Sequence, residues 1–531
     1  MVFEVLVLSA LILTTRCANY RDVFLAGNIY FVDADCYSRM TRVRLCAQHP
    51  GLVLRHHDFE NFPKGTNPHT TAPLDYTILI FSLFLRPFTT RSIELAGAFI
   101  SPLCALIGGL FLWWWSQKMR FRFRWAMLIL FALSPILVHG TELGRPDHQS
   151  LALVLVIVAI CCDWALLSSE LAGWKLVSGL AWGLAIWVSA YEPLLLVLVS
   201  TVGARMSRVD RRIPDRSKRT DYLSIWTNNL YLGTASRYLK WFALGTVLVV
   251  ALVVERRFPS LPAFAGYPIF LNWSRSIGEL AQIPLLSSIW FNWLGWLIIA
   301  APVLWVFGRR NDSGRIPLTM VILLVATFLL TLWQARWGYF LAAIFAIVLP
   351  LLLGRIRSGV LAWTLFICSL WPILRDWDSR IWPDPLTAAR QVEQRHEAIG
   401  LREVSLNMIS TELRPFLAPW WLSPAIAYWS GQPGIAGSSH ESLPGIADSA
   451  RFFLTDDVAT AGEILRQRQV AWVISYDAER VERNSSAILG QKAPENSLAR
   501  VLDQRPAQAP GFLALSTQTG SEKLFQVTNK W

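Results

Sequence analysis

Acidic residues stand in three polar segments of the chain, and each segment adjoins a run of apolar residues. YFVDADCYSRMTRVR carries Asp33 and Asp35, ELGRPDHQS carries Asp147 and His148, and WSRSIGELAQ carries Glu279. Ionisable groups beside lipid are costly and mark functional sites. Carboxylate oxygens are the hard ligands that Mg²⁺ and Mn²⁺ prefer. The three segments therefore predict a divalent-cation site built from distant parts of the chain.

An arginine adds a second positive charge to this predicted site. Arg336 lies in LWQARWGYF, and the order of the apolar runs puts it at the same membrane face as the acids. A cation and an arginine together would neutralise a phosphate leaving group, so the pattern favours a phosphate-bearing lipid substrate. Taken singly, each residue has a simpler interpretation: a solvated loop acid, a capping His148, or an Arg336 that anchors the chain at the interface.

The elements that must position these residues are membrane helices. The chain has 531 residues, of which 53% are hydrophobic, and 26 of them are tryptophans. Its mean hydropathy is +0.39. We therefore expect a polytopic α-helical membrane protein with about 11–13 transmembrane helices. The runs that we expect to span the membrane are 2–15, 93–115, 125–139, 150–167, 176–188, 194–206, 238–254, 285–307, 316–333, 339–353 and 360–374.

The net charge of +12 comes from basic clusters between these runs, at 118–124, 205–219, 309–315 and 355–357. This distribution is the positive-inside pattern, so we expect these loops in the cytoplasm and no nucleic-acid partner. The run 74–85 is too short to span, and we predict that it is a half-embedded part of a first outer loop over about residues 19–92.

The composition changes near residue 375, where charged residues and turns return. We therefore predict a transmembrane domain over 1–375 and a C-terminal extracytoplasmic α/β domain over 376–531. TAGEILRQRQVAWVISY predicts a helix, a turn and a buried strand within the second domain. The seven cysteines have no metal-binding spacing. Cys36 and Cys46 share the first outer loop and either pair or remain free thiols.

This layout resembles the GT-C membrane glycosyltransferases, among them the catalytic subunit of oligosaccharyltransferase and its bacterial relatives. DADCYSRMTRVR is similar to the family's first acidic element, and DFENFPKGTNPHTTAPLDY follows it as a Tyr/Phe-Pro-x-Gly segment does in relatives. GRPDHQ is similar to the second-loop motif, and SIGE resembles the family's Ser/Thr-Ile-x-Glu element.

The resemblance implies roles for the acidic residues. Asp35 matches the metal-binding aspartate of the first loop, with Asp33 as the second choice, and Asp147 matches that of the second loop. Gln149 stands where relatives often carry an acid or a histidine, which leaves the third ligand open and makes His148 its substitute.

The remaining implied contacts concern donor and acceptor. Glu279 would complete the metal shell or position the acceptor nucleophile, and Arg336 would contact donor phosphate or acceptor. In oligosaccharyltransferases a Trp-Trp-Asp-Tyr-Gly motif reads the acceptor sequon. Here Trp420 and Trp421 hold a similar place in PWWLSP, but no aspartate and tyrosine follow them. The pair either binds acceptor or packs in the core of the outer domain.

The resemblance and the acidic loops together predict a metal-dependent, inverting glycosyltransferase that uses a polyprenyl-phosphate or polyprenyl-diphosphate sugar donor with Mn²⁺ or Mg²⁺. Its acceptor would be a protein, a lipid or a glycan, and its membrane the bacterial inner membrane with a periplasmic active site. Transfer to protein asparagine and transfer to a lipid or polysaccharide both remain open. A lipid or solute transporter is the non-enzymatic alternative, although transporters place ionisable residues at mid-membrane and often have two similar halves.

Overall fold

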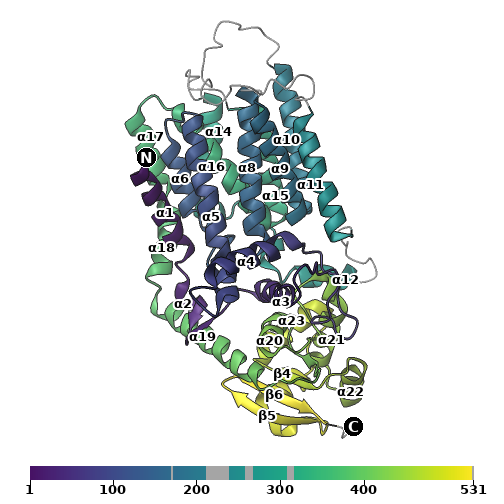
Figure 1. The fold of residues 1–531 in the computed structure, drawn as a ribbon. Coiled ribbons are helices and arrows are strands. Elements are labelled where there is room, and N and C mark those ends of the chain that lie inside the picture. Colours follow the sequence, from purple (N-terminus) through teal and green to yellow (C-terminus); the bar gives the residue numbers. More distant parts are fainter. Residues whose placement is uncertain (169–170, 211–237, 258–266, 308–315, 529–531) are drawn as a thin grey trace.

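The larger part of the molecule is a bundle of apolar helices (Figure 1). The computed structural model describes residues 1–168, 171–210, 238–257, 267–307 and 316–528. The helices of the bundle are α1 (Val2–Arg16), α5 (Ser92–Lys118), α6 (Arg124–Leu133), α7 (Pro135–His139), α8 (His148–Ser168), α9 (Ala172–Val188), α10 (Tyr191–Asp210), α11 (Leu239–Glu255), α13 (Ile289–Leu294), α14 (Leu297–Phe307), α15 (Leu318–Trp333), α16 (Gly338–Gly354), α17 (Gly359–Ser369) and α18 (Trp371–Ile381).

Each of the eleven apolar runs falls on one or more of these helices, so their helical structure is confirmed. Within the described residues, three helical segments are long and apolar enough to cross a membrane: Ser92–Lys118, His148–Leu167 and Ala335–Gly354. The pair α17 and α18, bent by 41°, passes the same test together. The chain is an integral membrane protein, and the count of about 11–13 spans stays a prediction. Most of the basic cluster 205–219 and all of 309–315 lie outside the described residues.

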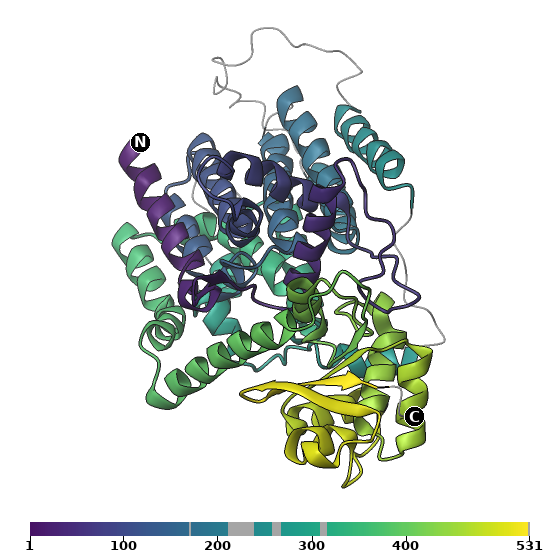
Figure 2. The ribbon, with the colours of Figure 1, turned by 60° about the horizontal axis from the view of Figure 1, so that its bottom comes forward.

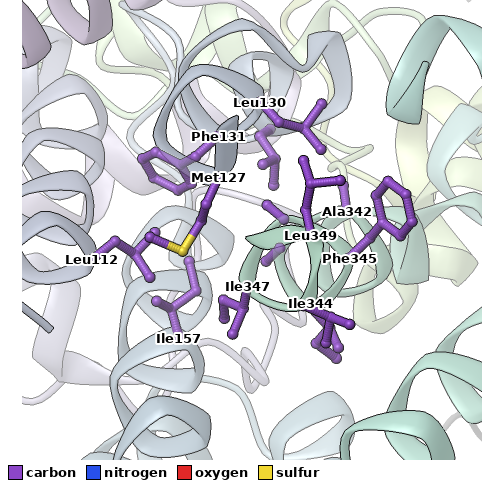
Figure 3. Close-up of a cluster of buried hydrophobic side chains, with 14 of the residues drawn as sticks. Leu112, Met127, Leu130, Phe131, Ile157, Ala342, Ile344, Phe345, Ile347 and Leu349 are labelled. Carbon is purple, nitrogen blue, oxygen red and sulfur yellow. The ribbon is translucent and has the colours of Figure 1, made fainter. Parts of the chain in front are cut away.

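The helix α16 forms the centre of the bundle because it is apolar on every side. Every residue from Gly338 to Leu353 is buried. Side chains such as Ile344 and Phe345 pack among those of α5, α6 and α8, where Met127 and Ile157 contribute to the same cluster (Figure 3). The residues at the start of α16 therefore have a fixed position, which matters for Arg336 and Tyr339 below.

The first outer loop is folded rather than irregular. It contains α2 (Tyr20–Val23), a two-stranded hairpin of β1 (Phe24–Leu25) and β2 (Asn28–Ile29), α3 (Ala34–Gln48) and α4 (Ala72–Leu85). The apolar helix α4 lies beside α3 at the end of the bundle (Figure 1). Buried Arg39 and Arg42 of α3 bind Asp75 of α4, with N–O distances of 2.8 and 2.7 Å. These bonds fix α3 against α4.

Cys36 and Cys46 are both free thiols in this structure. They lie ten residues apart on α3, which separates their Cα atoms by about 15 Å along a helix that rises 1.5 Å per residue. A disulfide needs a Cα separation below about 7 Å. Cys36 and Cys46 therefore remain free thiols, because the helix that carries both holds them too far apart to pair.

The C-terminal part folds as helices around one four-stranded sheet. Its elements are α19 (Pro385–Leu406), β3 (Phe416–Leu417), α20 (Ser423–Ser430), η5 (His440–Ser442), α21 (Leu443–Leu454), α22 (Val458–Gln467), β4 (Trp472–Ser475), α23 (Ala478–Leu489), α24 (Leu498–Gln504), η6 (Pro506–Gln508), β5 (Leu513–Thr519) and β6 (Glu522–Val527). The strand order is β3-β4-β6-β5, with β3 parallel to β4 and the other pairs antiparallel. The predicted helix, turn and buried strand are α22 and β4, which is fully buried.

The C-terminal part lies against the first outer loop at the end of the bundle (Figure 2). Arg44 of α3 donates a hydrogen bond to the carbonyl of Tyr428 in α20 at 2.7 Å, and its guanidinium lies 3.5 Å from the centre of the Tyr428 ring. Arg468 donates to Asn61 and to the carbonyl of Phe62, both at 3.1 Å. These contacts hold the C-terminal part against the first outer loop.

Candidate active site

The three acidic segments meet at this junction. Asp35 lies in the first turn of α3, Asp147 immediately precedes α8, and Glu279 lies in the short helix η3 (Gly278–Leu280). The Asp35 side chain is exposed to solvent on one side. Desolvation by the surrounding protein and the negative charges of Asp33, Asp147 and Glu279 raise its pKa to about 8. The Ser438 hydroxyl bonds the same carboxylate. Four carboxylates therefore lie close enough to interact electrostatically.

Glu279 is held by two neutral donors. The Gln149 side chain donates to its Oε2 at 2.6 Å, and the Tyr339 hydroxyl donates to its Oε1 at 3.1 Å. Burial and the charge of Asp147 raise the pKa of Glu279. Gln149 is the residue at which the resemblance left the third ligand open. Its amide nitrogen is used to orient Glu279, so a neutral donor here links the second and third acidic segments.

Asp147 and His148 form a close pair, with Nδ1 of the imidazole 2.6 Å from Oδ1 of the carboxylate. Burial would raise the pKa of Asp147, but His148 and the nearby Arg145 and Arg39 outweigh it and lower this pKa. The Nδ1 atom is engaged, which leaves Nε2 as the ring nitrogen for any further ligand. The role of His148 as a metal ligand stays a prediction.

Asp33 supports the site from its edge. It caps α3 by accepting a hydrogen bond from the backbone N–H of Cys36 at 3.0 Å, as an N-cap aspartate does. Its other oxygen accepts a bond from Arg145 at 2.7 Å. Arg145 also donates to Glu142 at 3.1 Å. With Asp33 bound on both oxygens, Asp35 is the carboxylate of this loop that is available to a ligand.

A chain of hydrogen bonds joins the two sides of the site. Arg145 Nη2 lies 3.1 Å from His139 Nε2, and His139 Nδ1 lies 2.8 Å from the Tyr339 hydroxyl. Because the guanidinium can only donate, His139 must accept at Nε2 and donate from Nδ1. Tyr339 then donates to Glu279. The hydrogen bonds therefore all run in one direction: Arg145 donates to His139, His139 to Tyr339, and Tyr339 to the Glu279 carboxylate.

Arg336 lies in η4 (Ala335–Trp337), directly before α16. Its guanidinium bonds Glu192 of α10 at 2.7 Å, and both side chains line a small pocket together with Gln149 and Tyr339. The arginine is thus placed beside Glu279 but is partly neutralised by Glu192. Three helices, α3, α8 and α16, begin around this site. The positive ends of their dipoles favour an anion such as phosphate.

Trp420 and Trp421 take part in packing. The Trp420 ring lies 5.7 Å from that of Trp273 and 6.1 Å from that of Trp421. Its indole N–H donates to Asn484 at 2.8 Å. Trp421 packs against a buried cluster of the C-terminal part that includes Leu417. These contacts fit the packing alternative, and an acceptor-binding role for the pair stays a prediction.

Four residues of this site were not predicted from the sequence: Arg145, Tyr339, His139 and Glu192. Arg145 lies two residues before Asp147 in the motif itself, and Tyr339 lies three residues after Arg336, one helical turn away. Both could have been found by asking what must orient the predicted acids. His139 ends the apolar run 125–139, and Glu192 lies in the short gap between the runs 176–188 and 194–206. A buried ionisable residue next to membrane-spanning segments is itself a signal of function.

No protein-family model and no curated protein sequence matches the chain. Solved structures do match. One is the oligosaccharyltransferase of Archaeoglobus fulgidus tethered to an acceptor peptide with an NVT sequon. It is 14% identical with a TM-score of 0.61, and the match covers 99% of this chain and 74% of the archaeal chain. The same enzyme in complex with Zn and sulfate is 13% identical, with a TM-score of 0.61 over 99% of this chain and 73% of its own.

A bacterial structure matches over its whole length. ArnT from Cupriavidus metallidurans bound to undecaprenyl phosphate is 13% identical, has a TM-score of 0.56, and covers 100% of this chain and 97% of its own. Likeness at this identity establishes the fold. The expected resemblance to GT-C membrane glycosyltransferases is therefore confirmed at the level of the fold.

Proposed function

We propose that the chain is a metal-dependent glycosyltransferase that moves a sugar or oligosaccharide from a polyprenyl-phosphate or polyprenyl-diphosphate donor to an acceptor. The observation that carries the proposal is the meeting of Asp35, Asp147 and Glu279, which come from three separate segments of a chain with the GT-C fold. The undecaprenyl phosphate bound to ArnT supports a polyprenyl donor.

The residues at this site fit a divalent cation. The raised pKa of Asp35 reflects desolvation by the surrounding protein and the unbalanced negative charge of its neighbours, which a cation would relieve. Carboxylate oxygens suit Mg²⁺ or Mn²⁺, and Asp35 and Asp147 would hold the ion, with Glu279 or His148 as a further ligand. The archaeal structure in complex with Zn and sulfate supports a divalent cation in a protein of this fold. When bound, the cation would neutralise the phosphate leaving group.

The chain's own residues would direct a single displacement. The acceptor oxygen or nitrogen forms a bond to the anomeric carbon as the bond from that carbon to the lipid phosphate oxygen breaks, with inversion and without a protein nucleophile. Glu279, oriented by Gln149 and Tyr339, would position the acceptor group and take its proton. Arg336 would contact the phosphate oxygens at the pocket that it shares with Glu192.

The acceptor that we propose is a lipid or glycan rather than a protein sequon. Leu422, Ser423 and Pro424 follow the tryptophan pair, and the last two begin α20. The Ser423 hydroxyl is buried and bonds the carbonyls of Ala418 and Pro419 at 3.2 and 3.0 Å. This hydroxyl is used within the helix start, which argues against a sequon-reading role at this place.

We infer that the site and the C-terminal domain face the periplasm of a bacterial inner membrane. The basic clusters between the apolar runs support this orientation, because positive loops remain in the cytoplasm. Residues 376–531 would then form an extracytoplasmic domain over the mouth of the active site.

The decisive experiment separates an enzyme from a transporter. Cells that lack the protein should accumulate a polyprenyl-linked sugar, and mass spectrometry of that lipid identifies the donor. The purified protein in detergent, where transport has no meaning, should release polyprenyl phosphate or diphosphate from this lipid when membrane glycolipids are added as acceptor. Accumulation in cells without release in detergent would overturn the enzymatic proposal in favour of a transporter.

A further inference from the structure

Two histidines and a glutamate gather beside the active site at the contact between the first outer loop and η5 of the C-terminal part. They are His69, His440 and Glu441, whose ligand atoms all lie within 4.8 Å of one another. His69 Nδ1 is 3.0 Å from Glu441 Oε1, and His440 Nε2 is 3.5 Å from the same oxygen. The two imidazole rings are stacked with their centres 5.1 Å apart. Both rings thus direct a nitrogen toward one carboxylate.

The loop that carries His69 is held independently of this cluster. Arg257, just after α11, donates hydrogen bonds to the carbonyls of Pro68 and Thr70, the second at 2.7 Å. Glu255 accepts a bond from the backbone N–H of Ala72 at 2.9 Å. The backbone on both sides of His69 is therefore fixed by the end of α11.

The opposite half of the cluster is held by a different set of bonds. Ser442, the last residue of η5, donates to the buried carboxylate of Glu60 at 3.1 Å. Glu60 belongs to the first outer loop, so it ties η5 to the same loop that carries His69. The backbone N–H of His69 also donates to Glu441 at 2.7 Å. The three ligand groups are thus brought together by supports on both sides, as a preorganised site requires.

The ligand chemistry differs from that of the candidate active site. Two imidazoles and one carboxylate form a set that binds Zn²⁺, with a fourth position left for water or another ligand. Bonds of about 2.0–2.1 Å in a tetrahedral site place ligand atoms about 3.3 Å apart, close to the separations of 3.0 and 3.5 Å here. The His69 side chain is 38% exposed, so an ion has access from solvent.

We propose that His69, His440 and Glu441 bind a Zn²⁺ ion that fastens the C-terminal part to the first outer loop. The ion would be a second metal, separate from the one held by Asp35 and Asp147. It would lie beside the active site, because the His69 ring is 6.3 Å from the ring of His148, the neighbour of Asp147. Closing this contact with a metal would fix the C-terminal part beside the candidate active site.

The test is the zinc content of the full chain, purified in detergent without a polyhistidine tag and dialysed against excess Mg²⁺. We expect one zinc per chain by elemental mass spectrometry, and loss of it in His69→Ala and in Glu441→Gln. Co²⁺ added to chelator-treated protein should give the visible absorption bands of a tetrahedral site, and His69→Ala should abolish them.

His56→Ala is the matched control, because His56 lies in the same loop, is exposed, and pairs with Asp58 at 2.9 Å. It should keep its zinc, and so should Asp35→Asn, which disables only the other site. Zinc should also raise the melting temperature of the wild type and of His56→Ala but not of His69→Ala. Zinc content that is unchanged by His69→Ala, or that falls in Asp35→Asn instead, would overturn the proposal. None of these readouts depends on transfer activity.

Discussion

Arg145 Nη1 lies 2.7 Å from Asp33 Oδ2 and joins the second acidic segment to the first. The two residues are 112 positions apart in the chain. Asp33 caps the helix whose first turn carries Asp35, and Arg145 lies two residues before Asp147. A single ion pair therefore sets the spacing of the two aspartates that we propose as metal ligands.

We expect Arg145→Ala to lower transfer roughly 10- to 100-fold, as the loss of a group that orients metal ligands does. Arg145→Lys should recover part of the loss, because a lysine reaches Asp33 but cannot also bind Glu142 and His139. The apparent Mn²⁺ concentration for half-maximal activity should rise in both variants. If that concentration stays constant while activity falls, Arg145 acts on the substrate and not through Asp33.

Asp35→Asn and Asp147→Asn should each reduce transfer roughly 100- to 1,000-fold, the usual cost of removing a group that stabilises transition-state charge. The asparagine keeps the shape and removes the charge, so the protein should remain folded in the membrane. Asp58→Asn is the control, since this loop aspartate is 66% exposed and pairs with His56.

Chelation supplies an independent check of the same site. EDTA should abolish activity, and Mn²⁺ or Mg²⁺ should restore it to the wild type but not to the two asparagine variants. Near-normal transfer by both variants in metal-free buffer would rule out the metal site at Asp35 and Asp147.

The sequence was sufficient to predict the helices and to select the acidic residues that the structure brings together. Apolar runs and acidic loops are local patterns, and Asp35, Asp147 and Glu279 could be selected from them. The supporting contacts have no local pattern. His69 meets Glu441 across 372 positions, and Arg145 meets Asp33 across 112. Such pairs become visible only when packing of the bundle fixes which segments are neighbours.

Gln149 is another residue whose contact could not be predicted from the local sequence. Comparison of motifs treats it as a missing ligand, because relatives often carry an acid or a histidine there. In the structure its amide donates to Glu279 at 2.6 Å, so the substitution supplies a contact that the motif alone does not reveal. A motif gives the chemical types at a site, and the three-dimensional arrangement decides how each is used.

Reporter fusions test the orientation on which the proposed localisation rests. Fusions at Gly65 and Gly490 should be active as periplasmic reporters, because the first outer loop and the C-terminal part lie together at one end of the bundle (Figure 1). Fusions at Ser217 and Asn311, which lie outside the described residues, should report the cytoplasm, because they stand in basic segments. A cytoplasmic signal at Gly490 would contradict the orientation.

The acceptor proposal has a direct test with peptides. Given a polyprenyl-diphosphate glycan, the protein should not distinguish an Asn-x-Thr peptide from the same peptide with Asn-x-Ala, because no aspartate and tyrosine follow Trp421 to bind the threonine hydroxyl. Product formation followed by mass spectrometry measures the difference. Efficient transfer that requires the threonine would show that the chain acts on protein sequons.

Glu279 has two proposed roles, and its hydrogen-bond partners allow them to be separated. If it is a metal ligand, Glu279→Gln should raise the Mn²⁺ requirement and reduce transfer about as much as Asp35→Asn, because both remove a charged ligand. If it positions the acceptor and takes its proton, Glu279→Gln should lower the rate roughly 100- to 10,000-fold with the metal requirement unchanged.

Tyr339→Phe removes only the 3.1 Å bond to Oε1 and keeps the ring that packs at the start of α16. One hydrogen bond to a charged carboxylate contributes about 1.5–3 kcal/mol, so we expect Tyr339→Phe to slow transfer roughly 10- to 100-fold. Titration of Mn²⁺ at saturating sugar donor and acceptor gives the maximal rate of transfer and the metal affinity of each variant. The acceptor role predicts that Glu279→Gln and Tyr339→Phe share the wild-type metal affinity, and a weakened affinity in Glu279→Gln assigns the residue to the metal instead.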